Sequence, residues 1–270
     1  MMRKGVPQIQ ATARTLAMLE AIVADGGRSS VSALARTIGI PVATAHRQVA
    51  TLLAQAYVAT NPRGGYVAGP RLVGLLHRLD AKEIIANASA PFLDDVAREL
   101  GTVVQLGTFE NDMVTYRIKA GPGSASLFTK VGMQLEAYCS GMGKVLLAHL
   151  PETERDAYLA AGPFPALTER TITDPSELRA ELRTVHEIGH AIDNEEIAAG
   201  LTCVAVPVRT SDGNVVAAIS ASFAAPLREN LLHAAVGALT MAASRVKRSV
   251  GLPDCHDAGG RRGDDVEAGA

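Results

Sequence analysis

Apolar residues recur at helical spacing in residues 12–24, a pattern that predicts a first amphipathic helix. The apolar residues at this spacing are Ala13, Leu16, Leu19 and Val23. Gly26 and Gly27 follow directly. They end the predicted helix, because glycine commonly occupies the position just past the last helical turn.

Two further helices are predicted on either side of a tight turn. Ser32 is the expected N-cap of the first, which turns Leu34, Ala35 and Ile38 inward. Gly39 breaks that helix, and Pro41 stands at the expected first position of the next, residues 41–55. The inward face of this second helix is expected to hold Ala45, Val49, Leu52 and Leu53. A short helix, a glycine turn and a second helix together predict a helix-turn-helix.

A β-hairpin is predicted next, because the β-prone runs 57–60 and 66–68 flank the turn sequence NPRGG. It would form the wing of a winged helix-turn-helix domain covering residues 9–69. Pro70 then begins a predicted linker helix, residues 70–90. One face of that helix carries Leu72, Leu75, Leu76 and Leu79. This face either packs against a partner subunit or covers its own chain.

The pattern changes to alternating helices and strands over residues 91–252, which predicts a second, mixed α/β domain in a chain of the α+β class. The expected strands are 103–109, 114–118, 203–208 and 215–222. The expected helices are 141–149, 152–160, 176–188 and 228–250. Asp212-Gly213 is a strong hairpin signal between the last two strands. The tail, 253–270, has no apolar period and is predicted to be disordered.

Composition is that of an ordinary globular protein, with 47% hydrophobic and 20% charged residues in a chain of 270. The longest nearly apolar stretch, 215–227, is too short to span a bilayer, and we expect a cytoplasmic protein with no membrane partner. The cysteines are three, widely spaced and without a CxxC pair. We therefore expect reduced thiols, no metal site and no cofactor.

Charge is unevenly distributed along the chain. Residues 1–80 carry nine Lys or Arg and three acids, a net +6, so the rest must sum to −8 for the overall −2. A basic N-terminal segment favours contact with a polyanion such as DNA, although six excess charges also suit a solvated face.

The predicted second helix of the helix-turn-helix supplies the candidate DNA contacts, because its N-terminal half enters the major groove in such domains. Arg47 is expected to contact a guanine edge or a phosphate, Thr44 a phosphate or a thymine methyl, and His46 a phosphate. Arg63, at the tip of the wing, is expected to reach the neighbouring minor groove or its backbone. The same face also presents Ala43 and Thr51. The alternative is that these are ordinary solvent-facing residues.

Several sequence blocks resemble the IclR family of bacterial regulators, in the order and spacing of that family and over roughly residues 12–250. The blocks are SVSALARTIGIPVATAHRQVATLLAQAYV with GGYVAGPRLVGL, then VGMQLEAYCSGMGKVLLAHLP, LTERTITDPSELRAELRTVHEIGHAIDNEEIAAGLTCVAVPV and GNVVAAISASF. One departure is that Val42 and Ala43 stand where the family usually has a polar, often basic pair. Base readout is therefore expected to shift towards Thr44, Arg47 and apolar contact with thymine methyls.

The resemblance implies a GAF-like effector-binding domain, in which a mixed sheet flanked by helices encloses a small-molecule pocket. It also implies a repressor or activator that binds a palindromic operator as a homodimer or homotetramer and senses a small carboxylate or aromatic catabolite. Carried over position by position, the implied pocket residues are Leu127, Leu135, the backbone of Gly141 and Met142, Asp193, Leu201, Cys203, Ser220 and Ser222.

The residues themselves support part of this pocket. Ser220 and Ser222 are two apart on a strand, so both hydroxyls point to one face, where a ligand or a neighbouring carbonyl can bond them. Gly141 begins a predicted helix, and free amides there favour an anion. The alternative to a ligand contact is that Cys203 is a small buried apolar residue and that Asp193 is a turn residue. His190, which adjoins this region, is expected to be a packed histidine rather than a ligand contact.

The alternative function is that of a GAF-like small-molecule-binding protein, or of an enzyme, without regulatory DNA binding. The segment 141–144, GMGK, lacks the glycine and the Ser or Thr of a phosphate loop, so Lys144 is expected to carry a surface charge. Spacing alone leaves open a nucleophilic pair of Cys203 with His186 or His190. With no oxyanion glycine cluster and no metal-spaced ligand set, we expect no enzyme.

Overall fold

The computed structural model describes residues 7–62, 64–210 and 212–250. Residue 250 alone is described by its backbone without its side chain. The described residues divide into two compact units, the first ending at Leu79 and the second beginning at Asp80. This boundary falls inside the linker that the sequence predicts. The predicted tail, 253–270, lies outside the described residues.

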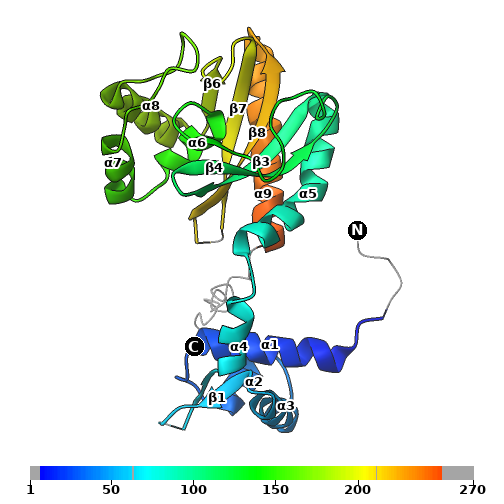
Figure 1. Cartoon of the computed structure of the whole chain (residues 1–270). Coiled ribbons are helices and arrows are strands. Elements are labelled where there is room, and N and C mark those ends of the chain that lie inside the picture. The colour runs from blue at the N-terminus through cyan, green and yellow to red at the C-terminus, as the bar shows by residue number, and fades with distance from the viewer. Residues whose placement is uncertain (1–6, 63, 211, 251–270) are drawn as a thin grey trace, which may run out of the picture. The chain divides into compact units, whose positions relative to one another are not determined.

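The first unit has the predicted order of a winged helix-turn-helix (Figure 1). The β-hairpin pairs its two strands antiparallel, with Ala59 opposite Val67. The elements are α1 (Gln10–Asp25), α2 (Val31–Thr37), α3 (Val42–Ala54), β1 (Val58–Thr60), β2 (Tyr66–Ala68) and α4 (Pro70–Leu76).

The predicted first helix is present, and its buried face is formed by residues other than those that revealed it. Met18 and Ile22, one helical turn apart, are fully buried, whereas Leu16 is 54% exposed and Val23 is 45% exposed. Because α1 is apolar on more than one face, its periodicity predicts the helix but does not select the buried face. On α3, Ala45, Val49 and Leu52 are buried as expected, but Leu53 is 40% exposed.

The helix starts also differ by one or two residues from those predicted. Ser30, not Ser32, caps α2, and its hydroxyl accepts the amide of Ala33 at 3.2 Å. Pro41 is the N-cap of α3, so the helix proper begins at Val42. Both changes leave the helix-turn-helix intact.

The predicted single linker helix, 70–90, is replaced by two helices. After α4, a new helix, α5 (Ala81–Leu100), begins at Asp80, whose carboxylate accepts the amides of Lys82 and Glu83. Pro91 lies inside α5 rather than at the start of the second domain. No residue of α4 is buried within this chain, and its leucine face is largely exposed.

The second unit is built on a six-stranded sheet in the order β5-β4-β3-β8-β7-β6. Every described strand pairing in it is antiparallel, so the α+β class is confirmed but the expected mixed sheet is not. β5 and β6 were not predicted, because strands of three and four residues leave little alternation. The strands are β3 (Val103–Glu110), β4 (Met113–Ala120), β5 (Gln134–Glu136), β6 (Ala191–Asn194), β7 (Leu201–Arg209) and β8 (Val215–Ala224).

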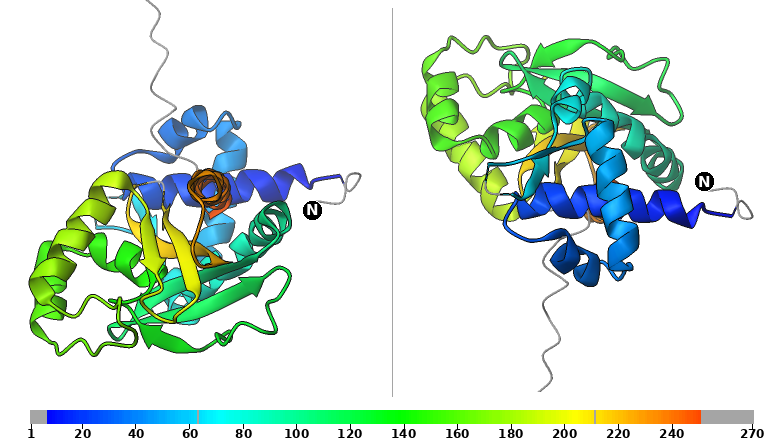
Figure 2. Two further views of the ribbon diagram at one scale, coloured as in Figure 1. Left: turned by 90° about the horizontal axis from the view of Figure 1, so that it is seen from above. Right: turned by 90° about the horizontal axis from the view of Figure 1, so that it is seen from below.

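Helices cover both faces of this sheet (Figures 1 and 2). α5 and α9 (Glu229–Val250) pack side by side on one face, against Val204, Val206 and Ile219. On the other side lie α6 (Gly141–Ala148), α7 (Glu152–Ala160) and α8 (Pro175–Ile188). Ala205 and Ala218 belong to the apolar cluster on that side. Side chains thus alternate between two cores along β7 and β8, as a strand requires.

Among the described residues, no helix is both long enough and apolar enough to cross a bilayer.

Gly143 provides a test of the packing of α6. A Cβ at this position would overlap the carbonyl oxygen of Ala137, since the helix backbone passes directly over that residue. Gly143→Ala is expected to lower the free energy of unfolding by about 1–3 kcal/mol, the usual cost of overpacking. Urea unfolding followed by circular dichroism measures the change.

The matched control is Gly237→Ala in α9, where a Cβ would have open space around it. This substitution is expected to stabilise the protein by about 0.5–1 kcal/mol, because alanine favours a helix interior over glycine. If the urea unfolding curves of Gly143→Ala and wild type have equal midpoints and slopes, the close approach of α6 to Ala137 is contradicted.

Candidate functional site

The predicted DNA-contacting face of α3 lies on the surface of the first unit. It stands opposite the buried face formed by Ala45, Gln48, Val49 and Leu52. Thr51 is exposed, but its hydroxyl donates to the carbonyl of Arg47 at 2.9 Å and is thus engaged within the helix. Thr44 is half-buried, and the exposed members of the predicted set are Val42, Ala43, His46, Arg47 and Thr51.

Arg63, the predicted wing contact, lies outside the described residues. The hairpin around it closes through Asn61, whose side-chain oxygen accepts the amide of Gly65 at 3.1 Å. The structure therefore describes the base of the hairpin and the predicted DNA-contacting face of α3.

The second unit contains a small internal cavity on the α6 side of the sheet. Its volume is about 10 Å³, room for about one water molecule. Eight of the nine predicted effector residues line it, namely Leu127, Gly141, Met142, Asp193, Leu201, Cys203, Ser220 and Ser222. The sequence did not single out the remaining lining residues, which are Gln105, Tyr116, Phe128, Thr129, Ser140 and Ile197.

Leu135 is the one predicted effector residue that does not line this cavity. It lies on the short edge strand β5 and packs against the apolar cluster beneath α6. The family resemblance placed it in the pocket, but its side chain instead contributes to the core beside it.

Strand alternation brings the two serines to the cavity, as predicted. Ser220 pairs across the sheet with Gln105, and Ser222 pairs with Cys203 on β7. The thiol of Cys203 lies 3.4 Å from the hydroxyl of Ser222. Gln105 donates from its amide to the hydroxyl of Thr129 at 2.6 Å, which ties the segment over the cavity to the sheet. The cavity wall is thus polar on an otherwise apolar sheet.

Asp193 closes a turn and also lines the small cavity. One carboxylate oxygen accepts the amides of Glu196 at 2.8 Å and Ile197 at 3.3 Å, which closes the turn after β6. The other oxygen receives no hydrogen bond from any residue that the structure describes. Burial raises the pKa of this carboxyl to about 7, and the neighbouring charge of Glu196 acts in the same direction. Asp193 therefore changes charge near neutral pH.

The start of α6 presents backbone donors to the same cavity. Ser140 caps the helix, since its hydroxyl accepts the amide of Gly143 at 3.1 Å and its carbonyl accepts that of Lys144 at 2.9 Å. Within the described residues, the amides of Gly141 and Met142 donate to no group. Two free amides at a helix N-terminus favour an anion.

The cysteines have no partner for nucleophilic chemistry among the described residues. Burial raises the pKa of the Cys203 thiol, and raises that of Cys139 to about 12, so both stay protonated at neutral pH. His186 contacts the carbonyl of Ala148 at 3.0 Å and His190 that of Ile188 at 3.4 Å, rather than a thiol. The described residues also contain no cluster of side chains able to hold a metal ion.

Lys144 is buried, which corrects the expectation of a surface charge. Its side chain is 1% exposed, and its ammonium donates to Glu181 at 3.0 Å, to the carbonyl of Ile192 at 3.1 Å and to Glu196. The carboxylates come from residues 37 and 52 positions away, so local spacing could not reveal them. This arrangement binds the ammonium within the protein and excludes a role in holding phosphate.

Comparison with known proteins finds one family match for the N-terminal helix-turn-helix part of the chain and another for the C-terminal part. The family described as "IclR helix-turn-helix domain" matches residues 11–62, and the one described as "Bacterial transcriptional regulator IclR C-terminal" matches residues 76–248. The HTH-type transcriptional regulator XynR of Escherichia coli is 29% identical over 219 residues, which cover 80% of this chain and 87% of that protein.

Solved structures agree with these matches. The IclR of Thermotoga maritima is 28% identical, with a TM-score of 0.59 over 91% of this chain and 100% of that one. An IclR homolog from Microbacterium hydrocarbonoxydans, solved as a complex with 4-hydroxybenzoate, is 26% identical, with a TM-score of 0.58 over 89% of this chain and 98% of that one. These relatives are regulators rather than enzymes, and the chain described here belongs to the IclR family of transcriptional regulators.

Proposed function

We propose that this regulator couples the occupancy of the cavity beside α6 to its affinity for a palindromic DNA operator. The observation that carries the proposal is the cavity itself. It gathers two free amides of α6, a free oxygen of Asp193 and two serine hydroxyls in a protein with a DNA-binding domain. Buried polar groups without partners are costly, and a ligand can supply the missing hydrogen bonds.

The DNA-binding role is assigned to residues 9–69. Two copies of the chain place their α3 helices in successive major grooves of a two-fold operator, so the functional unit is a dimer or a pair of dimers. Arg47 contacts a guanine edge or a phosphate, and Val42 and Ala43 meet thymine methyls. Thr44 and His46 complete this face, and Arg63 extends it through the wing. A partner of this kind places the protein in the bacterial cytoplasm.

The effector is a small organic acid that also carries a hydroxyl group. Its carboxylate accepts the amides of Gly141 and Met142, and its hydroxyl bonds to the free oxygen of Asp193. This assignment removes the conflict of placing an acid beside Asp193, because that carboxyl is near its pKa of about 7 at neutral pH. The relative bound to 4-hydroxybenzoate, an acid with a hydroxyl, supports this class.

Binding of such an acid requires a rearrangement, since the cavity measures only about 10 Å³. Leu127, Phe128 and Thr129 line it from a segment between strands, and their displacement widens it. The acid changes DNA affinity only to the extent that it binds the widened and closed states differently.

Arg47→Ala tests the recognition face. Loss of a guanine or phosphate contact is expected to weaken operator binding by about 1–3 kcal/mol at fixed salt. A gel shift with DNA from upstream of the gene provides the measurement. Arg183→Ala, on an exposed position of α8 in the other unit, is the control and should bind like wild type. Equal affinities for Arg47→Ala and wild type would show that α3 does not contact DNA as proposed.

The double substitution Ser220→Ala/Ser222→Ala tests the effector cavity. The ligand is the acid with the largest thermal shift in a screen that includes 4-hydroxybenzoate. At about one hundred times its dissociation constant it stabilises wild type by about 2.7 kcal/mol. The variant should keep operator binding and lose most of this stabilisation. Retention of the full stabilisation would place the effector elsewhere, and loss of DNA binding as well would indicate misfolding.

The pH dependence of effector affinity tests the role of Asp193. Below its pKa of about 7 the carboxyl is neutral, whereas above it the carboxylate repels a bound anion. Affinity for the anionic acid should therefore fall by about tenfold from about pH 6 to pH 8. In Asp193→Asn, calorimetric titrations should give a flat profile. An affinity that rises with pH in wild type is incompatible with the proposed binding mode.

A further inference from the structure

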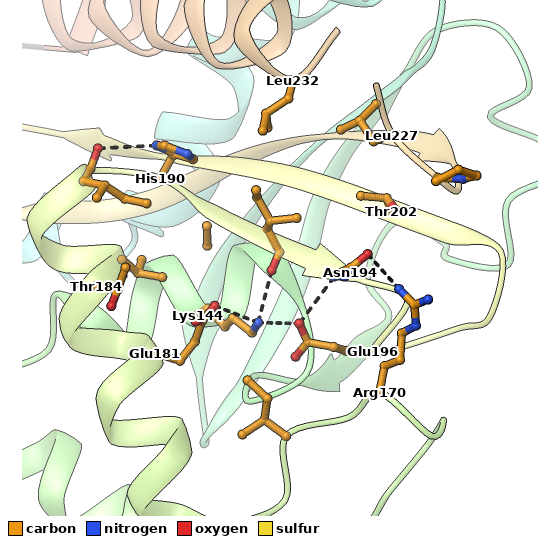
Figure 3. Close-up of a pocket in the computed structure, with 16 residues that line it drawn as sticks. Lys144, Arg170, Glu181, Thr184, His190, Asn194, Glu196, Thr202, Leu227 and Leu232 are labelled. Atoms are coloured by element: carbon orange, nitrogen blue, oxygen red, sulfur yellow. Dashed lines mark hydrogen bonds and ion pairs between the residues drawn. The ribbon is translucent and has the colours of Figure 1, made fainter. Parts of the chain in front are cut away.

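A second, larger cavity of about 800 Å³ lies at the outer edge of the sheet, beside β6 (Figure 3). It shares no lining residue with the effector cavity. Strand alternation explains the separation, because Leu201 and Cys203 on β7 line the effector cavity whereas Thr202 between them lines this one. Asp193 and its neighbour Asn194 divide in the same way on β6.

Lys144 forms the base of this edge cavity together with two carboxylates. Figure 3 shows its ammonium between Glu181 and Glu196, with a third bond to the carbonyl of Ile192. An ammonium group has three donors, so Lys144 has none left for a ligand. Two carboxylates against one ammonium leave one negative charge in excess at the base.

Arg170 does not neutralise that excess charge. It lies at the rim, where its guanidinium pairs with Glu195 at 3.1 Å and donates to Asn194 at 3.3 Å. Its own positive charge is therefore matched by a carboxylate outside the base.

Two buried polar atoms in the lining lack partners. Glu196 is 4% exposed and Thr202 is 2% exposed. Within the described parts of the chain, the second carboxylate oxygen of Glu196 and the hydroxyl of Thr202 make no hydrogen bond. Burial raises the pKa of Glu196, which Lys144 only partly offsets, as expected of a carboxylate short of positive charge. The two atoms do not lie together: the Glu196 carboxylate accepts the amide of Asn194 at the outer edge of β6, whereas Thr202 lies opposite Asn194 on β7. The Glu196 oxygen, at the base beside Lys144, is the one placed to accept a cationic donor.

The remaining wall is largely apolar. Ile188 at the end of α8 contributes hydrocarbon surface, and so do Leu227 and Leu232 at the start of α9. Figure 3 shows both leucines on the side of the cavity away from Lys144. A ligand suited to this cavity thus carries a positive donor at one end and a hydrocarbon body at the other.

We propose that the edge cavity is a second ligand site, distinct from the effector cavity, for a small organic amine. The ammonium of the ligand donates to the free oxygen of Glu196, which a small movement of the side chains around it opens to the cavity, and it balances the excess charge that Glu181 and Glu196 leave at the base. Its hydrocarbon part packs on Leu227 and Leu232. Proton transfer is not required, since the amine binds as its ammonium form at neutral pH.

Calorimetric titration of the full chain with 3-methylbutylammonium chloride tests the site, with 3-methylbutanol as the neutral probe of the same shape. The amine should bind saturably and at least about tenfold more tightly than the alcohol. Equal affinities, or no saturable binding of the amine, overturn the proposal. If a second copy of the chain covers the cavity, the amine will not bind saturably, and that result overturns the proposal as well.

Single substitutions test whether the amine binds through the residues proposed. Glu196→Gln keeps an oxygen for Lys144 but removes the charge, and it should weaken amine binding by at least about tenfold. Glu181→Gln removes the charge of the other carboxylate at the base and should weaken binding as well. Glu187→Gln, an exposed glutamate of α8 outside the cavity, is the matched control and should leave the affinity unchanged.

Two controls separate amine binding at the edge cavity from binding at the effector cavity and from misfolding. The Ser220→Ala/Ser222→Ala protein should bind the amine like wild type, because those serines line only the effector cavity. Far-ultraviolet circular dichroism shows whether each variant is folded, and Glu181→Gln, at a partly exposed position, carries the test if Glu196→Gln does not fold. Amine affinity that is unchanged in both folded cavity variants would refute the assignment, whatever the result with organic acids.

Discussion

The buried ammonium of Lys144 connects three segments of the second unit that are distant in sequence. It belongs to α6 and bonds to α8 through Glu181, to β6 through the carbonyl of Ile192, and to the following turn through Glu196. A buried ion pair of this kind tolerates little displacement, because loss of one partner leaves an unpaired charge in a dry environment. The position of α6, and hence of its two free amides, depends on this network.

The same network fixes the turn that carries Asp193. Glu196 accepts the amide of Asn194 and the ammonium of Lys144, while its own amide bonds to Asp193. The turn is therefore closed by side chains at both ends, which leaves one oxygen of Asp193 directed at the effector cavity. The site combines fixed donors on α6 with a fixed acceptor on the turn, an arrangement suited to a ligand with two polar ends.

Much of the local structure could be predicted from the sequence, because it depends on near neighbours. The helix-turn-helix, the wing and the shared face of Ser220 and Ser222 follow from spacing, glycine positions and strand alternation. The buried face of α1 could not be chosen, since Leu16 and Met18 are equally apolar and only the tertiary packing separates them. Similarly, the break between α4 and α5 depends on the capping by Asp80, which a continuous apolar pattern conceals.

The candidate site was predictable to a similar extent. The family resemblance supplied eight of the residues that line the small cavity beside α6, whereas Leu135, on a three-residue strand at the sheet edge, lies outside that lining. The burial of Lys144 was missed because a charged residue on a helix is normally solvated, and its two carboxylate partners become visible only when α6, α8 and β6 assemble.

The division of β6 and β7 between two cavities has a practical consequence for protein engineering. Libraries directed at Leu201, Cys203, Ser220 and Ser222 would vary the chemistry of one cavity while leaving every side chain of the other in place. The two strands at this edge therefore allow the two proposed ligand sites to be altered one at a time, as a biosensor with separately adjustable inputs would need.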